Sequence, residues 1–232
     1  MPDTRARALA LWEHFATTRA EGALTVAVAP DSRLCPPGWC GIVRLDGTTL
    51  ATAPTTGQAN LLRAALAGVE AAEHTSPRAL KAALPITGAL GPATLAYLTE
   101  TDFHPVPASD ATRLPAESAA AEALLRKAGP EEAGESGLAG LSIPLFTLTE
   151  GSEAIAAAGY EVLPGNVAHL SVLTAPAHRG RGLAKKVSSA AVSDALARNL
   201  LPQWRARPEE SRRVALTLGF RELGSQLSLH LN

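Results

Sequence analysis

The chain has 232 residues, of which 46% are hydrophobic and 19% charged, which is enough apolar material for one large domain or two small ones. Its 21 basic and 22 acidic side chains leave a formal net charge of -1, which argues against nucleic acid as a partner, because no global field would attract it. No apolar run is long enough to span a bilayer, and the N-terminal stretch lacks a signal-peptide core, so we expect a cytoplasmic protein with no membrane partner.

The N-terminal half alternates strand and helix patterns. Three strands are predicted, at 23–29, 41–45 and 48–53. Three helices follow, at about 58–71, 77–84 and 92–98. Asp46-Gly47 lies between the last two strands and is typical of a hairpin turn. We therefore expect a mixed α/β lobe over residues 1–110, to which the sequence assigns no role.

Two cysteines in this half, Cys35 and Cys40, belong to the segment LCPPGWC. We interpret them as packed thiols, with a strained disulfide or half of a metal site as the alternatives. The chain has no second cysteine pair and no cluster of histidines, so no metal site is expected.

A proline-rich stretch from Asp102 to Ser118 interrupts every periodic pattern and marks the expected domain boundary. Residues 116–232 then form the second predicted domain. Its predicted elements are, in order, a helix at 116–129, a polar loop at 130–137, strands at 143–150, 153–163 and 167–174, a helix at 182–200, a strand at 200–207, a helix at 208–218 and a strand at 222–231.

The strand 167–174 leads into a turn with two glycines and then into a helix. Gly180 and Gly182 remove Cβ where a phosphate would approach the main chain, and a helix start offers unpaired backbone N–H groups. Four cations surround the same turn, namely Arg179, Arg181, Lys185 and Lys186. This combination favours a pyrophosphate site; a glycine-containing turn with solvated arginines is the alternative.

The pattern P-x-x-R-G-x-G-x-A after an apolar strand resembles motif A of the GNAT superfamily of N-acetyltransferases, here with R-G-x-G-x-A at 179–184. The superfamily's S-x(7)-G-F ending is also present, as Ser211, Gly219 and Phe220. The resemblance covers roughly residues 116–232. It implies a GNAT-like α/β fold with a mixed sheet in the C-terminal half, preceded by the smaller α/β lobe.

The resemblance also implies acetyl-CoA as co-substrate. In the superfamily the glycine loop binds the pyrophosphate, and the main chain of the preceding strand binds the pantetheine arm. The implied cofactor-binding residues are Val172, Leu173, Thr174, Arg179, Gly180, Arg181, Gly182, Leu183, Ala184, Lys185 and Ser211.

The same resemblance implies direct attack of an amine on the thioester, with the backbone N–H of Val172 as oxyanion donor. A glutamate of some members is replaced by Ala168. The candidate bases are therefore His169, which strict alternation points to the opposite face from Val172, and Glu132 and Glu135 in the loop after the first helix. The alternatives are that His169 is a packed or hydrogen-bonded strand histidine and that Glu132 and Glu135 belong to an exposed acidic loop.

Two further departures from the family concern the thiolate leaving group. Ala215 stands where the usual acidic tyrosine would be, and Pro208 replaces an asparagine three residues before Ser211. Trp204 either borders the thioester pocket or fills core. We expect an N-acetyltransferase of primary amines, monomeric or homodimeric, with a non-catalytic acyl-CoA-binding or interaction module as the alternative.

Overall fold

A computed structural model of the chain describes residues 4–141 and 143–232, which form two compact units. Unit 1 holds the described residues up to Ala96 together with Arg205–Pro208 and Glu222–Asn232. Unit 2 holds Tyr97–Trp204 and Glu209–Arg221. The division into lobes at 1–110 and 116–232 stays a prediction, and these units differ from it mainly because the C-terminal strand belongs to unit 1.

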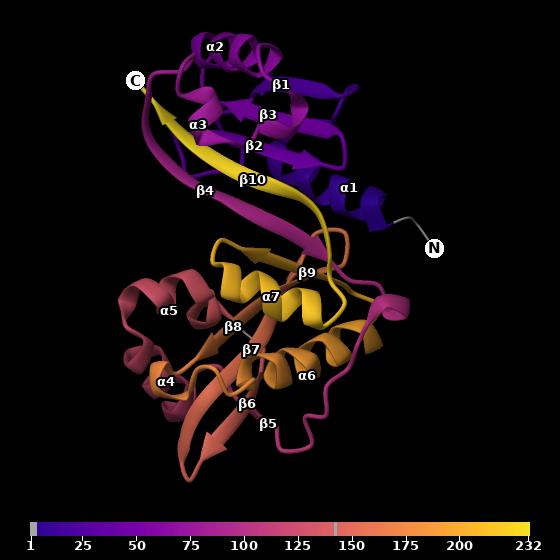
Figure 1. Cartoon of the computed structure of the whole chain (residues 1–232), viewed down its shortest axis with the longest axis vertical. Coiled ribbons are helices and arrows are strands. Elements are labelled where there is room, and N and C mark those ends of the chain that lie inside the picture. The colour runs from indigo at the N-terminus through magenta and orange to yellow at the C-terminus, as the bar shows by residue number, and fades with distance from the viewer. Residues whose placement is uncertain (1–3, 142) are drawn as a thin grey trace. The chain divides into compact units, whose positions relative to one another are not determined.

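Unit 1 is built from helices and a sheet (Figure 1). Its helices are α1 (Thr4–Ala16), α2 (Thr56–Ala67) and α3 (Pro77–Leu80), with a 3₁₀ turn at Ala71–Glu73. Its strands are β1 (Leu24–Val28), β2 (Cys40–Leu45), β3 (Thr48–Ala53), all but the last residue of β4 (Ile86–Tyr97) and all but the first residue of β10 (Arg221–Leu231), in the spatial order β1-β3-β2-β10-β4. Asp46 and Gly47 both have positive φ between β2 and β3, so the predicted hairpin turn is confirmed.

The core of unit 1 forms where α2 and α3 cover one face of this sheet. Leu62 and Leu66 of α2 are fully buried against strand residues such as Ile42 and Leu227. Thr55 caps α2, because its side chain accepts a hydrogen bond from the Gln58 N–H. Burial of this apolar face supplies the main stabilisation of the unit.

The predicted helix at 92–98 is wrong, because most of it lies in strand β4. Alanine and leucine give this segment a helix propensity, but propensity is a weak preference that tertiary pairing overrides. Leu95, Ala96 and Tyr97 are buried, and β10 lies beside β4 to satisfy its backbone groups.

The two cysteines are free thiols, which confirms the packed-thiol interpretation. Cys40 is fully buried, and the Cys35 thiol donates to the Trp39 carbonyl over 3.1 Å. Burial raises the pKa of Cys35 to about 11 and, together with the neighbouring Cys35, the pKa of Cys40 to about 12. Both side chains are therefore protonated at neutral pH.

Unit 2 is a mixed sheet with helices on both faces. Its helices are α4 (Ala119–Ala128), α5 (Pro130–Ser136), α6 (Leu183–Ala197) and α7 (Glu209–Thr217), with 3₁₀ turns at Glu100–Asp102, Leu138–Gly140 and Pro176–His178. Its strands are β5 (Thr112–Leu114), β6 (Leu145–Glu150), β7 (Glu153–Leu163), β8 (Val167–Thr174) and the first four residues of β9 (Leu201–Ala206), in the order β9-β8-β7-β6-β5. Only the pairing of β8 with β9 is parallel among the pairs of these five strands, which confirms the predicted mixed α/β class.

The two faces of this sheet are covered by different helices. On one face, the Tyr160 hydroxyl of β7 donates to Asp194 of α6. On the other face, Leu173 of β8 packs in a cluster with Ala121 and Leu124 of α4. Successive side chains of β8 therefore point alternately toward α6 and toward α4.

The predicted polar loop at 130–137 is wrong over most of its length, because residues 130–136 form α5. Pro130 occupies the first turn, where its missing N–H costs nothing, and Glu131 and Glu132 complement the positive end of the helix. These are helix-start signals that the polar composition of the segment concealed.

Replacing Gly219 with alanine should destabilise unit 2 more than a change at an open glycine. Gly219 has a φ of 95°, and a Cβ there would overlap the Asp102 carbonyl. Gly151 has a φ of 61° with nothing near its Cβ position, so Gly151→Ala is the matched control for backbone strain. We expect Gly219→Ala to lower the free energy of unfolding by about 3 kcal/mol or more, against about 1 kcal/mol for the control, in urea denaturation. Equal losses would contradict the overlap.

Candidate functional site

Strands β8 and β9 pair over only part of their length. Their parallel pairing runs from Val167–Leu201 to His169–Gln203, while β8 continues to Thr174. The last residues of β8 therefore have no β9 partner in this register. We call the unpaired stretch of β8 beyond His169 and Gln203 the opening beside β8, and these two residues mark its closed end.

The backbone of β8 alternates between its two neighbours. The Ala175 N–H donates to Ile155 on the β7 side over 2.9 Å, so odd-numbered N–H groups near it point toward β7. Val172 and Ala158 then form a pair that exchanges no hydrogen bonds, and the N–H of Val172 points toward the opening beside β9. An acceptor atom in that opening could therefore accept a hydrogen bond from the Val172 N–H.

The glycine turn follows β8 directly. Gly180 and Gly182 have φ of 76° and 75°, and a Cβ at either position would have no described atom within 4 Å. Gly182 is also the N-cap of α6, and as glycine it offers the helix no side-chain cap. The first N–H groups of this 15-residue helix therefore have no side-chain cap, and an anion is favoured at such a helix start.

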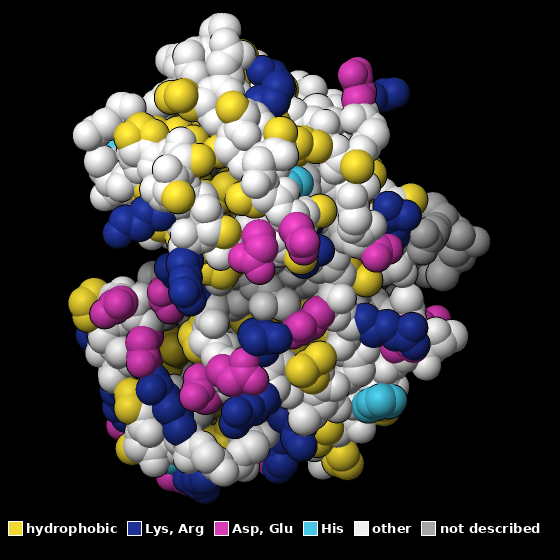
Figure 2. All heavy atoms as spheres, turned by 45° about the horizontal axis from the view of Figure 1, so that its top comes forward, with side chains coloured by type: hydrophobic (Ala, Val, Ile, Leu, Met, Phe, Trp, Pro, Cys, Tyr) yellow, Lys and Arg dark blue, Asp and Glu magenta, His cyan; other side chains and the backbone are white. Residues whose placement is uncertain are grey.

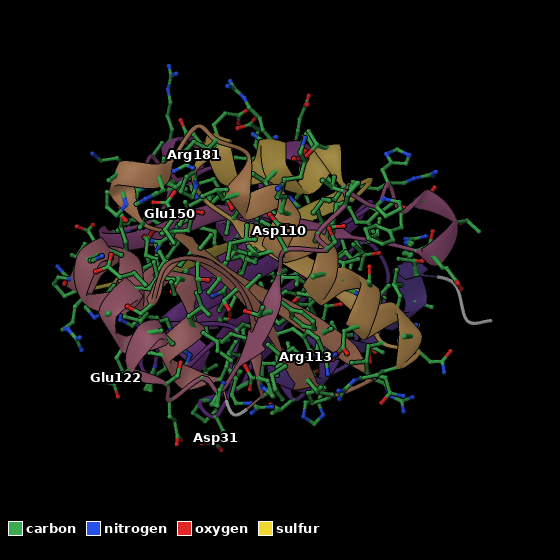
Figure 3. All side chains as sticks on the ribbon, turned by 90° about the horizontal axis from the view of Figure 1, so that it is seen from below. Asp31, Asp110, Arg113, Glu122, Glu150 and Arg181 are labelled. Carbon is green, nitrogen blue, oxygen red and sulfur yellow. The ribbon has the colours of Figure 1, made fainter. Side chains whose placement is uncertain are left out.

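The cations of this turn are held by carboxylates. Arg179 pairs with Glu132 of α5, Arg181 pairs with Glu150 of β6 at 3.1 Å, and Lys186 pairs with Asp110 at 3.0 Å. Figure 3 labels Arg181, Glu150 and Asp110 in this region of the chain. The side chains of these pairs are between 37% and 55% exposed, so water screens the attraction and a bound anion can compete with the carboxylates.

Glu150 is the carboxylate most closely tied to the turn. Its oxygens accept from Arg181 and from His178 Nε2, the latter at 3.2 Å. Hydrogen bonds, chiefly from His178 and secondly from Arg181, hold the pKa of Glu150 below its usual range, so the Glu150 carboxylate is ionised at neutral pH.

Two buried polar atoms beside the turn have no hydrogen-bond partner among the described residues. They are Thr174 Oγ1, at the end of β8, and His178 Nδ1, in the following 3₁₀ turn. Buried polar groups normally find partners, so these atoms indicate a place for a ligand or water. With the open glycine turn, they fit a phosphate-bearing group carried along β8.

The remaining residues predicted to bind the cofactor lie in α6 and α7. Leu183, Ala184 and Lys185 form the first turn of α6, and no described carboxylate forms a salt bridge with Lys185. Ser211, in α7, accepts a hydrogen bond from the Trp204 indole over 3.0 Å. Trp204 itself is buried and packs edge-on against Phe220, so it serves the core of unit 2.

The three candidate bases belong to two elements, His169 to β8 and both glutamates to α5. His169 is half-buried at the closed end of the opening, on the face opposite Tyr160 and α6. Glu132 of α5 forms an ion pair with Arg179 of the glycine turn. Glu135 is exposed on α5, whose C-terminal Gly137 lies beside Ser171 of β8.

Sequence reasoning missed three residues around His169. Gln203 Oε1 lies within hydrogen-bonding distance of His169 Nδ1, at 3.0 Å, and the Gln203 amide nitrogen donates to the buried Tyr97 hydroxyl at 2.8 Å. Glu161 stands opposite His169 in the β7–β8 register. The hairpin register alone would have identified Glu161, whereas the other two come from strands distant in the sequence.

Charge and hydropathy restrict the other kinds of site. Within residues 4–141 and 143–232, no helix is long and apolar enough to cross a membrane. The same described part of the chain contains no group of three or more histidine, cysteine or acidic side chains suited to a metal ion. On the face that Figure 2 shows, basic and acidic side chains are interspersed.

Comparison with known proteins identifies the family of this region. Residues 146–225 match the family model of the GNAT acetyltransferases. No curated protein sequence matches the chain.

Several solved structures are similar to the chain. An acetyltransferase of the GNAT family from Colwellia psychrerythraea superposes with a TM-score of 0.52 and 17% identity, over 67% of this chain and 61% of that one. A putative GNAT acetyltransferase from Novosphingobium aromaticivorans has a TM-score of 0.47 and 23% identity, over 62% and 65% of the two chains. A tandem GNAT protein from the clavulanic acid biosynthesis pathway has a TM-score of 0.46 and 14% identity, over 97% and 94%.

The match covers less than two thirds of the first two relatives. At 17% identity, the superposition with a TM-score of 0.52 bears on the fold alone. The family match spans β6 to β10 and includes both the opening beside β8 and the glycine turn before α6. Residues 146–225 are therefore similar in sequence to the GNAT acetyltransferase domain, which belongs to an acyltransferase family.

Proposed function

We propose that the chain is an N-acetyltransferase that transfers an acetyl group from acetyl-CoA to a primary amine by direct attack in a ternary complex. The observation that carries the proposal is the opening beside β8, which runs from His169 to a helix start with no side-chain cap. A pantetheine arm paired with Val172 to Thr174 would bring the pyrophosphate to the turn at 179–182. Acetyl-CoA is a co-substrate in this scheme.

Backbone and side-chain groups of this protein can be assigned to each step of the acetyl transfer. The Val172 N–H would donate to the carbonyl oxygen as negative charge develops there, which stabilises the tetrahedral intermediate. The amine nitrogen forms a bond to the carbonyl carbon, and the carbon–sulfur bond then breaks. His169 would accept the proton that the amine loses, with Glu135 and Glu132 as the second choice. Because Ala215 carries no acidic group, water would protonate the departing thiolate.

The positions of Val172 and His169 suit an acceptor that enters from the α4 side. The Val172 N–H points into the opening, and the His169 side chain lies on the face opposite α6. An amine arriving on that face would meet the proton acceptor before the thioester in the opening. The N-terminal lobe has no assigned part in this reaction.

The alternative function is a non-catalytic acyl-CoA-binding or interaction module. It is favoured by the alanines at 168 and 215 and by Pro208, which remove side chains that family members use. Both functions need the glycine turn, and only the first needs proton transfer.

Calorimetric titration of acetyl-CoA, followed by thiol release with a panel of amines, tests the proposal. We expect saturable binding and amine-dependent thiol release. Tight binding without release for any amine would support the non-catalytic module, and no binding would contradict both. Gel filtration of the same sample distinguishes a monomer from a homodimer, and the cytoplasm remains the predicted location.

Removing the carboxylate partner of Arg181 should strengthen acetyl-CoA binding. In Glu150→Gln the Arg181 guanidinium loses its carboxylate partner, so a phosphate can bind Arg181 without first breaking an ion pair. Exposed pairs are weak, so we expect a dissociation constant lower by about threefold. Glu122→Gln, which breaks the exposed pair with Arg126 on α4, is the matched control and should leave the constant unchanged. Weaker binding in Glu150→Gln would mean that the carboxylate instead orients Arg181 for the ligand.

A further inference from the structure

Three polar side chains lie in a row across the sheet of unit 1, on the neighbouring strands β3, β2 and β10 (Figure 1). Arg44 of β2 is paired with Thr49 of β3 on one side and with Ser225 of β10 on the other. Directly opposed residues of antiparallel strands share a face, with their Cβ atoms about 5 Å apart. This is the face that α2 and α3 cover, because Ile42, two residues before Arg44, belongs to the core cluster on that side.

Two consecutive residues of the segment after α2 bind the side chains on either side of Arg44. His74 Nδ1 lies 2.8 Å from the Thr49 hydroxyl, and the Thr75 hydroxyl lies 2.5 Å from the Ser225 hydroxyl. His74 and Thr75 are both buried. The stem of Arg44 therefore starts between two hydrogen-bonded pairs that join the sheet to this segment.

The pair on the β3 side is complete in its hydrogen bonds. His74 Nε2 lies 3.0 Å from the Leu66 carbonyl, which can only accept, so Nε2 carries a proton. In the neutral ring, Nδ1 then accepts from the Thr49 hydroxyl. Each hydrogen of these two side chains therefore has an acceptor.

Arg44 and the pair on the β10 side, by contrast, hold donors without acceptors. When Thr75 and Ser225 share one hydrogen bond, one hydroxyl hydrogen is used and the other needs an acceptor elsewhere, which no residue of 4–141 or 143–232 supplies. Arg44 Nε is buried and has no hydrogen-bond partner in the same part of the chain. No described carboxylate forms a salt bridge with Arg44, and Asp46, two residues further on, is paired with Arg5 instead.

The surplus of donors carries a positive charge, which determines what would satisfy it. Arg44 is half-buried, and a cation that loses part of its hydration without gaining a counterion is unfavourable. Water can accept hydrogen bonds but does not neutralise the charge. A carboxylate or phosphate group does both, because two of its oxygens match the parallel N–H groups of a guanidinium.

We propose that Arg44, together with the hydroxyls of Thr75 and Ser225, forms a binding site in unit 1 for a small oxyanion, the phosphate or carboxylate group of a ligand. The exposed part of Arg44 leaves the guanidinium accessible from solvent. The site shares no residue with the proposed acetyl transfer, so it is independent of that function. It gives the N-terminal part of the chain a role in ligand binding.

Proton–nitrogen NMR of the arginine side chains tests the site directly. The Nε–H signal of Arg44 is identified by its loss in Arg44→Lys, and inorganic phosphate or acetate is then titrated at constant ionic strength. We expect a saturable shift of this signal, with a dissociation constant on the order of a millimolar for phosphate. The double variant Thr75→Val with Ser225→Ala removes both hydroxyls and should raise the constant by about fivefold.

Urea denaturation gives a second measurement that does not depend on assigning a signal. Phosphate should raise the unfolding midpoint of the wild-type protein more than that of Arg44→Met, because only the wild-type protein gains a bound anion. Arg19→Met is the matched control, since Arg19 is an exposed arginine of unit 1, and it should respond as the wild-type protein does. Equal responses of Arg44→Met and the wild-type protein would contradict the site.

The remaining outcomes separate this site from the glycine turn. Gly182→Glu should leave the phosphate response of Arg44 unchanged, and loss of the response in that variant would mean that the anion binds at the turn and that the proposal is wrong. A response to phosphate alone or to acetate alone supports the proposal and identifies the ligand group. No saturable shift with either anion up to about 50 mM, or an equal shift with sodium chloride, would overturn it.

Discussion

Gly182→Glu is expected to abolish acetyl-CoA binding, with a dissociation constant raised by at least about 100-fold. The new side chain would enter the open space before the first turn of α6, where no described atom lies within 4 Å of the Cβ position. Its carboxylate would also repel the phosphates that the turn is expected to hold, and it would take their place on the uncapped N–H groups. Calorimetric titration measures the loss directly.

A control is needed because any side chain at a positive φ strains the backbone. Gly165, in the turn between β7 and β8, has a φ of 74° and equally open surroundings. It lies at the other end of β8 from the glycine turn, roughly 25 Å away for a strand of this length. Gly165→Glu therefore introduces the same strain and charge and should bind acetyl-CoA normally. Equal loss in the two variants would show that strain, and not the phosphate site, explains the result.

His169→Gln is expected to reduce kcat by about 100-fold or more while acetyl-CoA binds with unchanged affinity. The change removes the proton-accepting nitrogen but keeps a polar side chain beside Gln203. The glycine turn lies at the far end of β8, so the phosphate contacts should survive. Stopped-flow or steady-state assays of thiol release, together with calorimetry on the same sample, separate the two effects.

The matching control for this variant is His14→Gln, because His14 is exposed near the end of α1 in unit 1. Its kcat should equal that of the wild-type protein. If His169→Gln retains full activity, the proton acceptor is another group, and Glu135→Gln becomes the next variant to measure. If it loses acetyl-CoA binding as well, the result reflects damage to β8 and not a missing base.

Local signals in the sequence were sufficient for the region around the glycine turn. The apolar strand at 167–174, the two glycines at 180 and 182 and the helix after them each depend on residues close in the chain. The same holds for the hairpin at Asp46-Gly47, where positive φ favours these residue types. The family resemblance rested on such local patterns, and the match of residues 146–225 to the GNAT acetyltransferases confirms it.

Tertiary structure alone decided the features that depend on distant partners. Residues 92–97 are strand and not helix because neighbouring strands satisfy their backbone, which outweighs a propensity of less than about 1 kcal/mol per residue. The carboxylate partners of the turn cations come from α5, from β6 and from the segment before β5. Tyr97, Gln203 and His169 likewise meet only because three strands converge. Spacing along a chain carries no information about such contacts, since the fold, and not the local sequence, brings these side chains within hydrogen-bonding distance.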